Sequence, residues 1–97
     1  IIIGMHKDKN SFEAVKNLIP LAQQFITVDG FSAGNRDLDK HDLARLIRKA
    51  GGNAAAAQGG IMEEIRHAIR ENPDGGVLIC GSLFLVSYVK TNSGKIF

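Results

Sequence analysis

The sequence predicts an α/β fold: a single domain of three layers, with a mostly parallel sheet and helices on both faces. Short apolar runs alternate with segments whose apolar residues recur at helical spacing, which is typical of βαβ units. The run Val77–Cys80 has no polar face, as expected for a strand covered on both sides in a parallel sheet. A chain of 97 residues has room for one core, so residues 1–97 form one domain.

The first half of the chain supplies two strands and two helices. Ile1–Met5 and Phe25–Asp29 are apolar runs that predict the strands. Ser11 is placed to cap the helix between them, and Pro20 should end or kink that helix because proline lacks a backbone N–H donor. Asp39 is placed to cap the second helix, which a glycine pair ends.

The second half repeats the alternation. Asn53–Ala57 is predicted as a short strand from the rhythm of the pattern alone, since alanine has a low strand propensity. Ile61–Glu71 favours a helix, with apolar residues on one face, acids early and arginines late. Val77–Cys80 is the last strand, and a helix from Ser82 to about Val89 completes the order. We expect right-handed crossovers and Val77–Cys80 in the interior of the sheet.

Composition and charge argue against several classes of protein. A net charge of +2, from 12 basic and 10 acidic residues, with no Trp and one Tyr, argues against nucleic-acid binding. No apolar run approaches the roughly 20 residues that span a bilayer, so we expect a soluble protein without a membrane partner. The single cysteine, Cys80, lies in an apolar strand, which predicts a core thiol and a reducing, cytoplasmic location. No histidine has companions at metal-ligand spacing, so we predict no metal site.

Three groups of residues could carry chemistry. Gly30-Phe31-Ser32-Ala33-Gly34 matches the G-x-S-x-G nucleophile elbow of hydrolases, but no helix directly follows Ser32, so a glycine loop is the better interpretation. Lys9 follows the first strand and Gly81-Ser82 the last. Carboxyl ends of parallel strands meet at one edge, so the lysine ammonium, the serine hydroxyl and free helix N–H groups would form a carboxylate-binding corner. The structural alternative is a charged loop at Lys9 and an ordinary helix cap at Ser82.

Two stretches carry a resemblance to a known family. Gly4–Asn10 resembles the G-M-x-x-D-K-D stretch, and Val77–Leu83 the V-L-V-C-G-S-L stretch, of the carboxyl-terminal domain of folylpolyglutamate synthases/dihydrofolate synthases, in the Mur ligase superfamily. The resemblance implies a Rossmann-like Mur ligase carboxyl-terminal domain lacking its first strand. Asn10 replaces the family's usual acid, and Arg36 lies in a loop where the family often has Pro-Arg-Ala.

The resemblance also implies an activity. The family's enzymes are cytoplasmic ligases of folate biosynthesis and one-carbon metabolism, in which ATP with magnesium phosphorylates a carboxylate of dihydropteroate or folate and L-glutamate attacks the acyl phosphate. By resemblance, Lys9 and Ser82 bind the glutamate carboxylates, while Arg36 and Gly81 contact substrate or nucleotide.

The resemblance also implies that the groups which bind the nucleotide and the metal lie mainly outside this chain. ATP and magnesium would be held mainly by the enzyme's own amino-terminal ATPase domain. We therefore expect a piece of a longer, monomeric enzyme, without a catalytic or metal-binding residue of its own and inactive alone; the opening Ile1-Ile2-Ile3, which is typical of mid-strand, agrees with this. The alternative is a stand-alone α/β regulatory module that binds a nucleotide or another anion.

Overall fold

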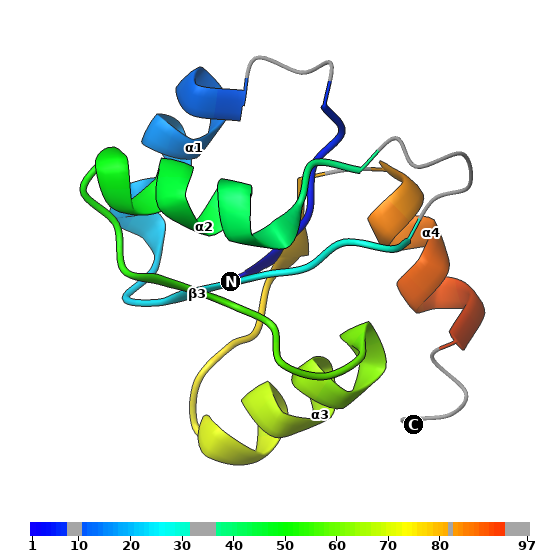
Figure 1. Ribbon diagram of the computed structural model, residues 1–97. Helices are drawn as coiled ribbons and strands as arrows, with labels where there is room; N and C mark the ends of the chain where they lie inside the picture. The colour runs from blue at the N-terminus through cyan, green and yellow to red at the C-terminus, as the bar shows by residue number, and fades with distance from the viewer. Residues whose placement is uncertain (8–10, 32–36, 82, 93–97) are drawn as a thin grey trace.

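The computed structural model describes residues 1–7, 11–31, 37–81 and 83–92. Within these ranges, four parallel strands form one sheet in the order β3-β2-β1-β4 (Figure 1). Their bounds are β1 (Ile2–Ile3), β2 (Phe25–Thr27), β3 (Ala54–Ala56) and β4 (Ile79–Cys80). Strands alternate with helices along the chain, so the predicted α/β class is confirmed.

The helices are α1 (Ser11–Leu18), α2 (Lys40–Lys49), α3 (Ile61–Glu71) and α4 (Leu83–Asn92), with a 3-10 helix η1 (Ile19–Leu21) directly after α1. Figure 1 shows α1 and α2 on one side of the sheet and α3 on the other. Across the part of the chain that is described, none of the helices has the length and apolar character needed to cross a membrane.

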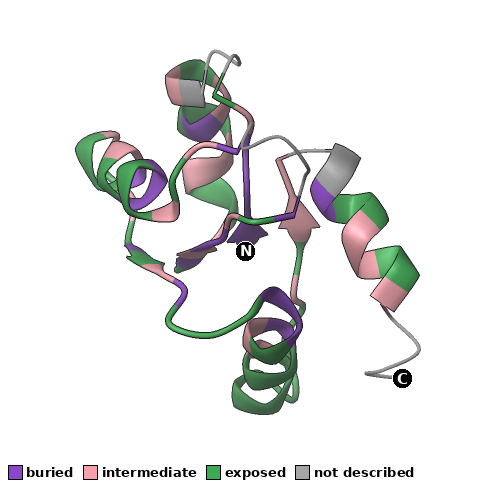
Figure 2. Ribbon diagram, turned by 45° about the vertical axis from the view of Figure 1, so that its right-hand side comes forward, coloured by how far each residue is buried: buried purple, intermediate pink, exposed green. Residues whose placement is uncertain are grey.

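Two hydrophobic clusters lie on opposite faces of the sheet because consecutive strand residues point to opposite sides. Ile2 belongs to the cluster formed with α3 and α4, which contribute the buried side chains of Ile65 and Leu85. The next residue, Ile3, belongs to the cluster formed with α1 and α2, where Leu43 is fully buried. Figure 2 shows the buried residues gathered on the strands and on the inner sides of the helices.

Several helix boundaries follow the predicted signals, but Ser11, which was predicted to cap the first helix, is instead the first residue of α1. The α-helix α1 ends at Leu18 and the chain tightens into η1 around Pro20, as expected for a residue without an N–H donor. Asp39 caps α2, and its Oδ1 accepts the N–H groups of His41 at 2.8 Å and Asp42 at 3.2 Å. The helix α3 has the predicted bounds, whereas α4 continues to the end of the described residues.

The alanine-rich strand β3 exists despite its low propensity. It is held by backbone pairing to β2, and the flanking bonds continue the ladder: the Phe25 N–H donates to the Asn53 carbonyl at 2.8 Å and the Ala57 N–H to the Thr27 carbonyl at 2.9 Å. Long-range pairing therefore overrides the weak local preference.

The prediction that Val77–Cys80 lies in the interior of the sheet is wrong. Among the described residues, β4 pairs only with β1 and forms an edge of the sheet. Ile79 and Cys80 are half-buried and Leu78 is 49% exposed, so the predicted core thiol is only partly enclosed. An apolar run indicates a strand, but strand order depends on the crossovers. The connection through α3 carries the chain from β3 past β2 and β1 to the far side of β1.

Candidate anion-binding site at the carboxyl edge of the sheet

The ends of β1, β2 and β4 leave the sheet together at its carboxyl edge. Ile3 of β1 lies opposite Cys80 of β4, and the Gly4 N–H donates to the Cys80 carbonyl at 3.3 Å. On the other side of β1, the Val28 N–H donates to the Ile3 carbonyl at 2.9 Å. Because all the strands are parallel, the segments that follow them share this edge, which is where crevices form in open α/β sheets.

Two glycines allow the strand ends to approach closely. Gly81 has a φ of +109°, and a Cβ there would collide with the carbonyl oxygen of Gly4 and lie 3.0 Å from Ile3 Cγ1. A Cβ on Gly4 would collide with the ring of Phe31 and lie 3.0 Å from the Val28 carbonyl oxygen. The end of β1 is therefore packed between the end of β4 and the segment that follows β2.

Three of the four site residues predicted from the sequence, Lys9, Arg36 and Ser82, lie outside the described residues. Their side-chain roles stay predictions. Gly81 is described and lies at the predicted edge, immediately before Ser82 and the start of α4. The contact of Gly81 with Gly4 brings together the described parts of the two stretches that carry the family resemblance.

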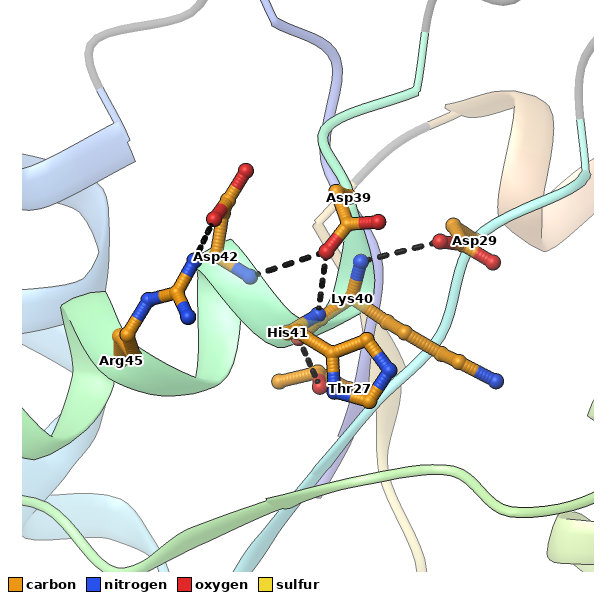
Figure 3. A network of polar contacts seen from close by, with 7 residues as sticks. All are labelled: Thr27, Asp29, Asp39, Lys40, His41, Asp42 and Arg45. Carbon is orange, nitrogen blue, oxygen red and sulfur yellow. Dashed lines mark hydrogen bonds and ion pairs between the residues drawn. The ribbon is translucent and has the colours of Figure 1, made fainter.

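The start of α2 is already occupied by the chain's own groups (Figure 3). The Asp39 side chain accepts the N–H groups of His41 and Asp42, and its backbone carbonyl accepts that of Leu43 at 2.9 Å. These contacts hold the pKa of Asp39 below its usual value, with the hydrogen bond from the Asp42 N–H as the largest cause. An outside anion at this helix start would compete with a carboxylate that is already bound.

The first residue of α2, Lys40, is bonded to β2 and to the segment that follows it. Asp29 Oδ2 accepts the Lys40 N–H at 3.0 Å, and Thr27 Oγ1 donates to the Lys40 carbonyl at 2.6 Å (Figure 3). Thr27 is fully buried, and its bond to the Lys40 carbonyl satisfies this polar side chain inside the core. Together the two bonds fix the start of α2 against β2.

The loop before α3 is also held by an internal carboxylate. Glu64 Oε1 accepts the N–H groups of Gln58 and Gly59, each at 3.2 Å. Glu64 lies in the first turn of α3, where the helix dipole favours a negative charge. This part of the carboxyl edge therefore carries its own anion.

The start of α4 differs from the other helix starts. The first turns of the other α-helices contain acids: Glu13 in α1, Asp42 in α2, and Glu63 and Glu64 in α3. The first turn of α4 contains no acid. Because N–H groups at a helix start favour anions, the start of α4 adds no carboxylate of its own that would repel an anionic ligand.

A buried hydrogen bond lies at the carboxyl edge of the sheet, where the segments that follow β1 and β2 meet. Asp37 is 7% exposed and its Oδ2 accepts the Phe31 N–H at 2.9 Å. The Phe31 ring stacks on the ring of His6, with centroids 6.4 Å apart and planes 12° apart. The Leu38 N–H donates to the Met5 carbonyl at 2.7 Å, so the segment before α2 is bound to the end of β1.

Sequence reasoning missed Asp29, Asp37 and Glu64. A usable signal existed for Asp29, because an acid directly after a parallel strand lies beside the starts of the neighbouring helices. Asp37 and Glu64 bond to N–H groups five or six residues away, and no local pattern distinguishes them from solvated acids.

A hollow of about 910 Å³ lies at the opposite, amino edge of the sheet, between the strand starts and α3. Its lining includes Ile1, Gln24, Asn53 and Leu78 at the strand starts and Glu71 of α3. Neither Gly4 nor Gly81 lines this hollow, so it is not the predicted site.

Comparisons of this chain with protein-family models, with curated proteins and with solved structures found no match.

Proposed function

We propose that this chain is the carboxyl-terminal domain of an ATP-dependent ligase that adds L-glutamate to dihydropteroate or folate, as in folylpolyglutamate synthases/dihydrofolate synthases. In this proposal the carboxyl edge binds the carboxylates of the incoming glutamate. Lys9 supplies a positive charge, and Ser82 supplies a hydroxyl next to the N–H groups at the start of α4. Arg36 and Gly81 add contacts with the substrate or the nucleotide.

The observation that supports the proposal most is the close approach of Gly81 to Gly4. It brings the ends of the two motif-bearing strands to one place, as a site shared between Lys9 and Ser82 requires. The acid-free first turn of α4 adds to this support, because the starts of α2 and α3 hold carboxylates of the chain itself. Charge-assisted hydrogen bonds to a carboxylate are about twice as strong as neutral ones, so two or three of them would orient glutamate.

The described residues do not fit a magnesium site. Asp29, Asp37, Asp39 and Glu64 each accept backbone N–H groups, and across the described ranges no three His, Cys, Asp or Glu residues are grouped to hold a metal ion. In the proposal, ATP and magnesium are bound mainly by the amino-terminal ATPase domain, as the family resemblance implies. No chemical step is assigned to the residues of this domain.

The test is a set of lysine and serine variants in the intact enzyme. Lys9→Ala and Ser82→Ala should raise the KM for glutamate by about 10- to 150-fold, which is the loss of roughly 1.5 to 3 kcal/mol from a charge-assisted contact, and leave the KM for ATP within about twofold. The lysine should have the larger effect because its charge has no substitute. Lys49→Ala, at the exposed end of α2, is the control and should change neither KM. Glutamate KM values within about twofold for both variants would refute the proposed site.

A second measurement separates the ligase from a stand-alone module. The 97-residue chain, given ATP, magnesium, dihydropteroate and glutamate, should release no phosphate above background, because the nucleotide and metal ligands lie in the other domain. Turnover by the chain alone would show that the active site is misplaced. A gene without a G-x-x-x-x-G-K-S/T stretch would favour the alternative, an α/β regulatory module that binds a nucleotide or another anion.

A further inference from the structure

Lys40, the first residue of α2, differs in its surroundings from the other lysines that the structure describes. Among the described lysines only Lys40 is half-buried, and the exposed ones are Lys7, Lys16, Lys49 and Lys90. Helical spacing places Lys40 on the inner face of α2, together with the buried side chains of Leu43, Ala44 and Ile47. A lysine is unusual on a buried helix face, because its ammonium group needs solvent or an anion.

The backbone of Lys40 is fixed on both sides by side chains from β2 and the segment that follows it. The Lys40 N–H donates to Asp29 Oδ2 at 3.0 Å, and the Lys40 carbonyl accepts the hydroxyl of the fully buried Thr27 at 2.6 Å. Figure 3 shows the lysine side chain extended, with its ammonium group pointing away from Asp39. The side chain therefore starts from a fixed point beside the carboxyl end of β2.

The acids at this edge do not neutralise the ammonium group of Lys40. Asp29, Asp39 and Glu64 accept backbone N–H groups of the chain. Lys40 forms no ion pair with another residue in the described ranges. A fixed, half-buried cation of this kind can bind an anion from outside the chain, and a charge-assisted hydrogen bond to a carboxylate is among the stronger polar contacts.

We propose that Lys40 binds the α-carboxylate of a glutamate that is already attached to folate. This assignment rests on the proposed function and concerns the acceptor rather than the incoming glutamate. Dihydropteroate ends in the one carboxylate that is activated, whereas folate ends in a glutamate with two carboxylates. When the γ-carboxylate of folate is activated, its α-carboxylate stays charged and requires a cation, which Lys40 supplies. Lys40 therefore favours the glutamylated acceptor.

The strand order gives the spacing that such an acceptor requires. β1 lies between β2 and β4, and neighbouring strands are about 4.8 Å apart, so the ends of β2 and β4 are about 10 Å apart. The α-carboxylates of two γ-linked glutamates are roughly 8 Å apart in an extended chain, by the reach of ordinary backbone bonds. In the proposal the start of α4 meets the incoming glutamate, and Lys40, beside the end of β2, meets the preceding one.

Steady-state kinetics of the intact enzyme with two acceptors tests this assignment. Lys40→Met keeps an unbranched stem and removes the charge. It should raise the KM for folate by about 10- to 150-fold and leave the KM values for dihydropteroate, glutamate and ATP within about twofold. Lys40→Arg keeps the charge and should stay within about threefold of the parent for folate. Lys49→Met, at the exposed end of α2, is the matched control and should change none of these values.

Four results would overturn the assignment and leave the ligase proposal standing, which the Lys9 and Ser82 variants test separately. They are an unchanged KM for folate in Lys40→Met, equal changes with both acceptors, a rise in the KM for glutamate, and an intact enzyme that uses dihydropteroate alone. Equal changes count against it because a variant with a damaged fold affects every substrate. An intact enzyme that uses neither acceptor would refute the ligase proposal and the role of Lys40 together.

Discussion

A methyl group added at Gly81 should destabilise the domain through two separate effects. Alanine at a φ of +109° is strained by about 1 to 2 kcal/mol. Its Cβ would also overlap the carbonyl oxygen of Gly4, a backbone atom directly after β1 that cannot rotate away as a side chain could. Forcing an extra carbon into a packed site adds about 1 to 3 kcal/mol. We therefore expect Gly81→Ala to lower the free energy of unfolding by about 3 kcal/mol, a large share of the stability of a small domain.

Two other glycines separate these effects. Gly30 has a φ of +77° but open space where a Cβ would lie, so Gly30→Ala should lose only the backbone term, about 1 to 2 kcal/mol. Gly76 has open space and no positive φ, so Gly76→Ala should change stability by less than about 1 kcal/mol and in the stabilising direction.

Urea denaturation of the three variants gives the changes in the free energy of unfolding. The variants are compared at a common slope of that free energy against urea concentration. In thermal melts the Gly81 variant should unfold about 12 °C or more below the parent, at roughly 4 to 8 °C per kcal/mol. If Gly81→Ala and Gly76→Ala were equally stable, the strand ends would not approach as described, and the site built on that approach would lose its main support.

Three further results are expected. Asp39→Ala should lower the melting temperature, while Asp39→Asn retains most of the cap. Because the folded-state pKa of Asp39 is depressed, its charged contribution is present at neutral pH and is lost as the pH falls from its ordinary value near 3.8 through the lower folded-state pKa. The decrease in urea midpoint from pH 6 to pH 3 should therefore be smaller in Asp39→Asn than in the parent. Burial raises the pKa of the Cys80 thiol, so a thiol reagent at pH 8 should label it more slowly in the folded chain than in urea, and equal rates would contradict the half-buried position. Ile65→Ala should destabilise the domain by about 2 to 5 kcal/mol and Ile69→Ala, 39% exposed on the same helix, by much less, as measured by urea unfolding.

The sequence was most informative where a signal is local. The cap at Asp39, the end of the first helix before Pro20 and the bounds of α3 depend on neighbouring residues and were predicted correctly. The position of β4 was predicted wrongly, because an apolar run looks the same in an edge strand and in an interior one. Strand order depends on which strands pair after the crossovers form, and no single segment contains that information.

The candidate site was predictable only in outline. Parallel strands place their carboxyl ends together, so the neighbourhood of Gly4 and Gly81 followed from the alternation of strands and helices. The carboxylates of Asp37 and Glu64, which bind N–H groups around this edge, were not predictable, since an acid that folds back on a loop has the same local sequence as one in solvent.

The pairing of β1 with β4 has a consequence for the order in which the chain folds. β1, β2 and β3 pair in the order of synthesis, but residues 2 and 3 bond to residues 79 and 80. At about 5 to 20 residues per second, a ribosome needs several seconds to pass from β2 to β4. The bond between β1 and β4 therefore forms last among the described strand pairs, and closing this largest loop completes the four-stranded sheet.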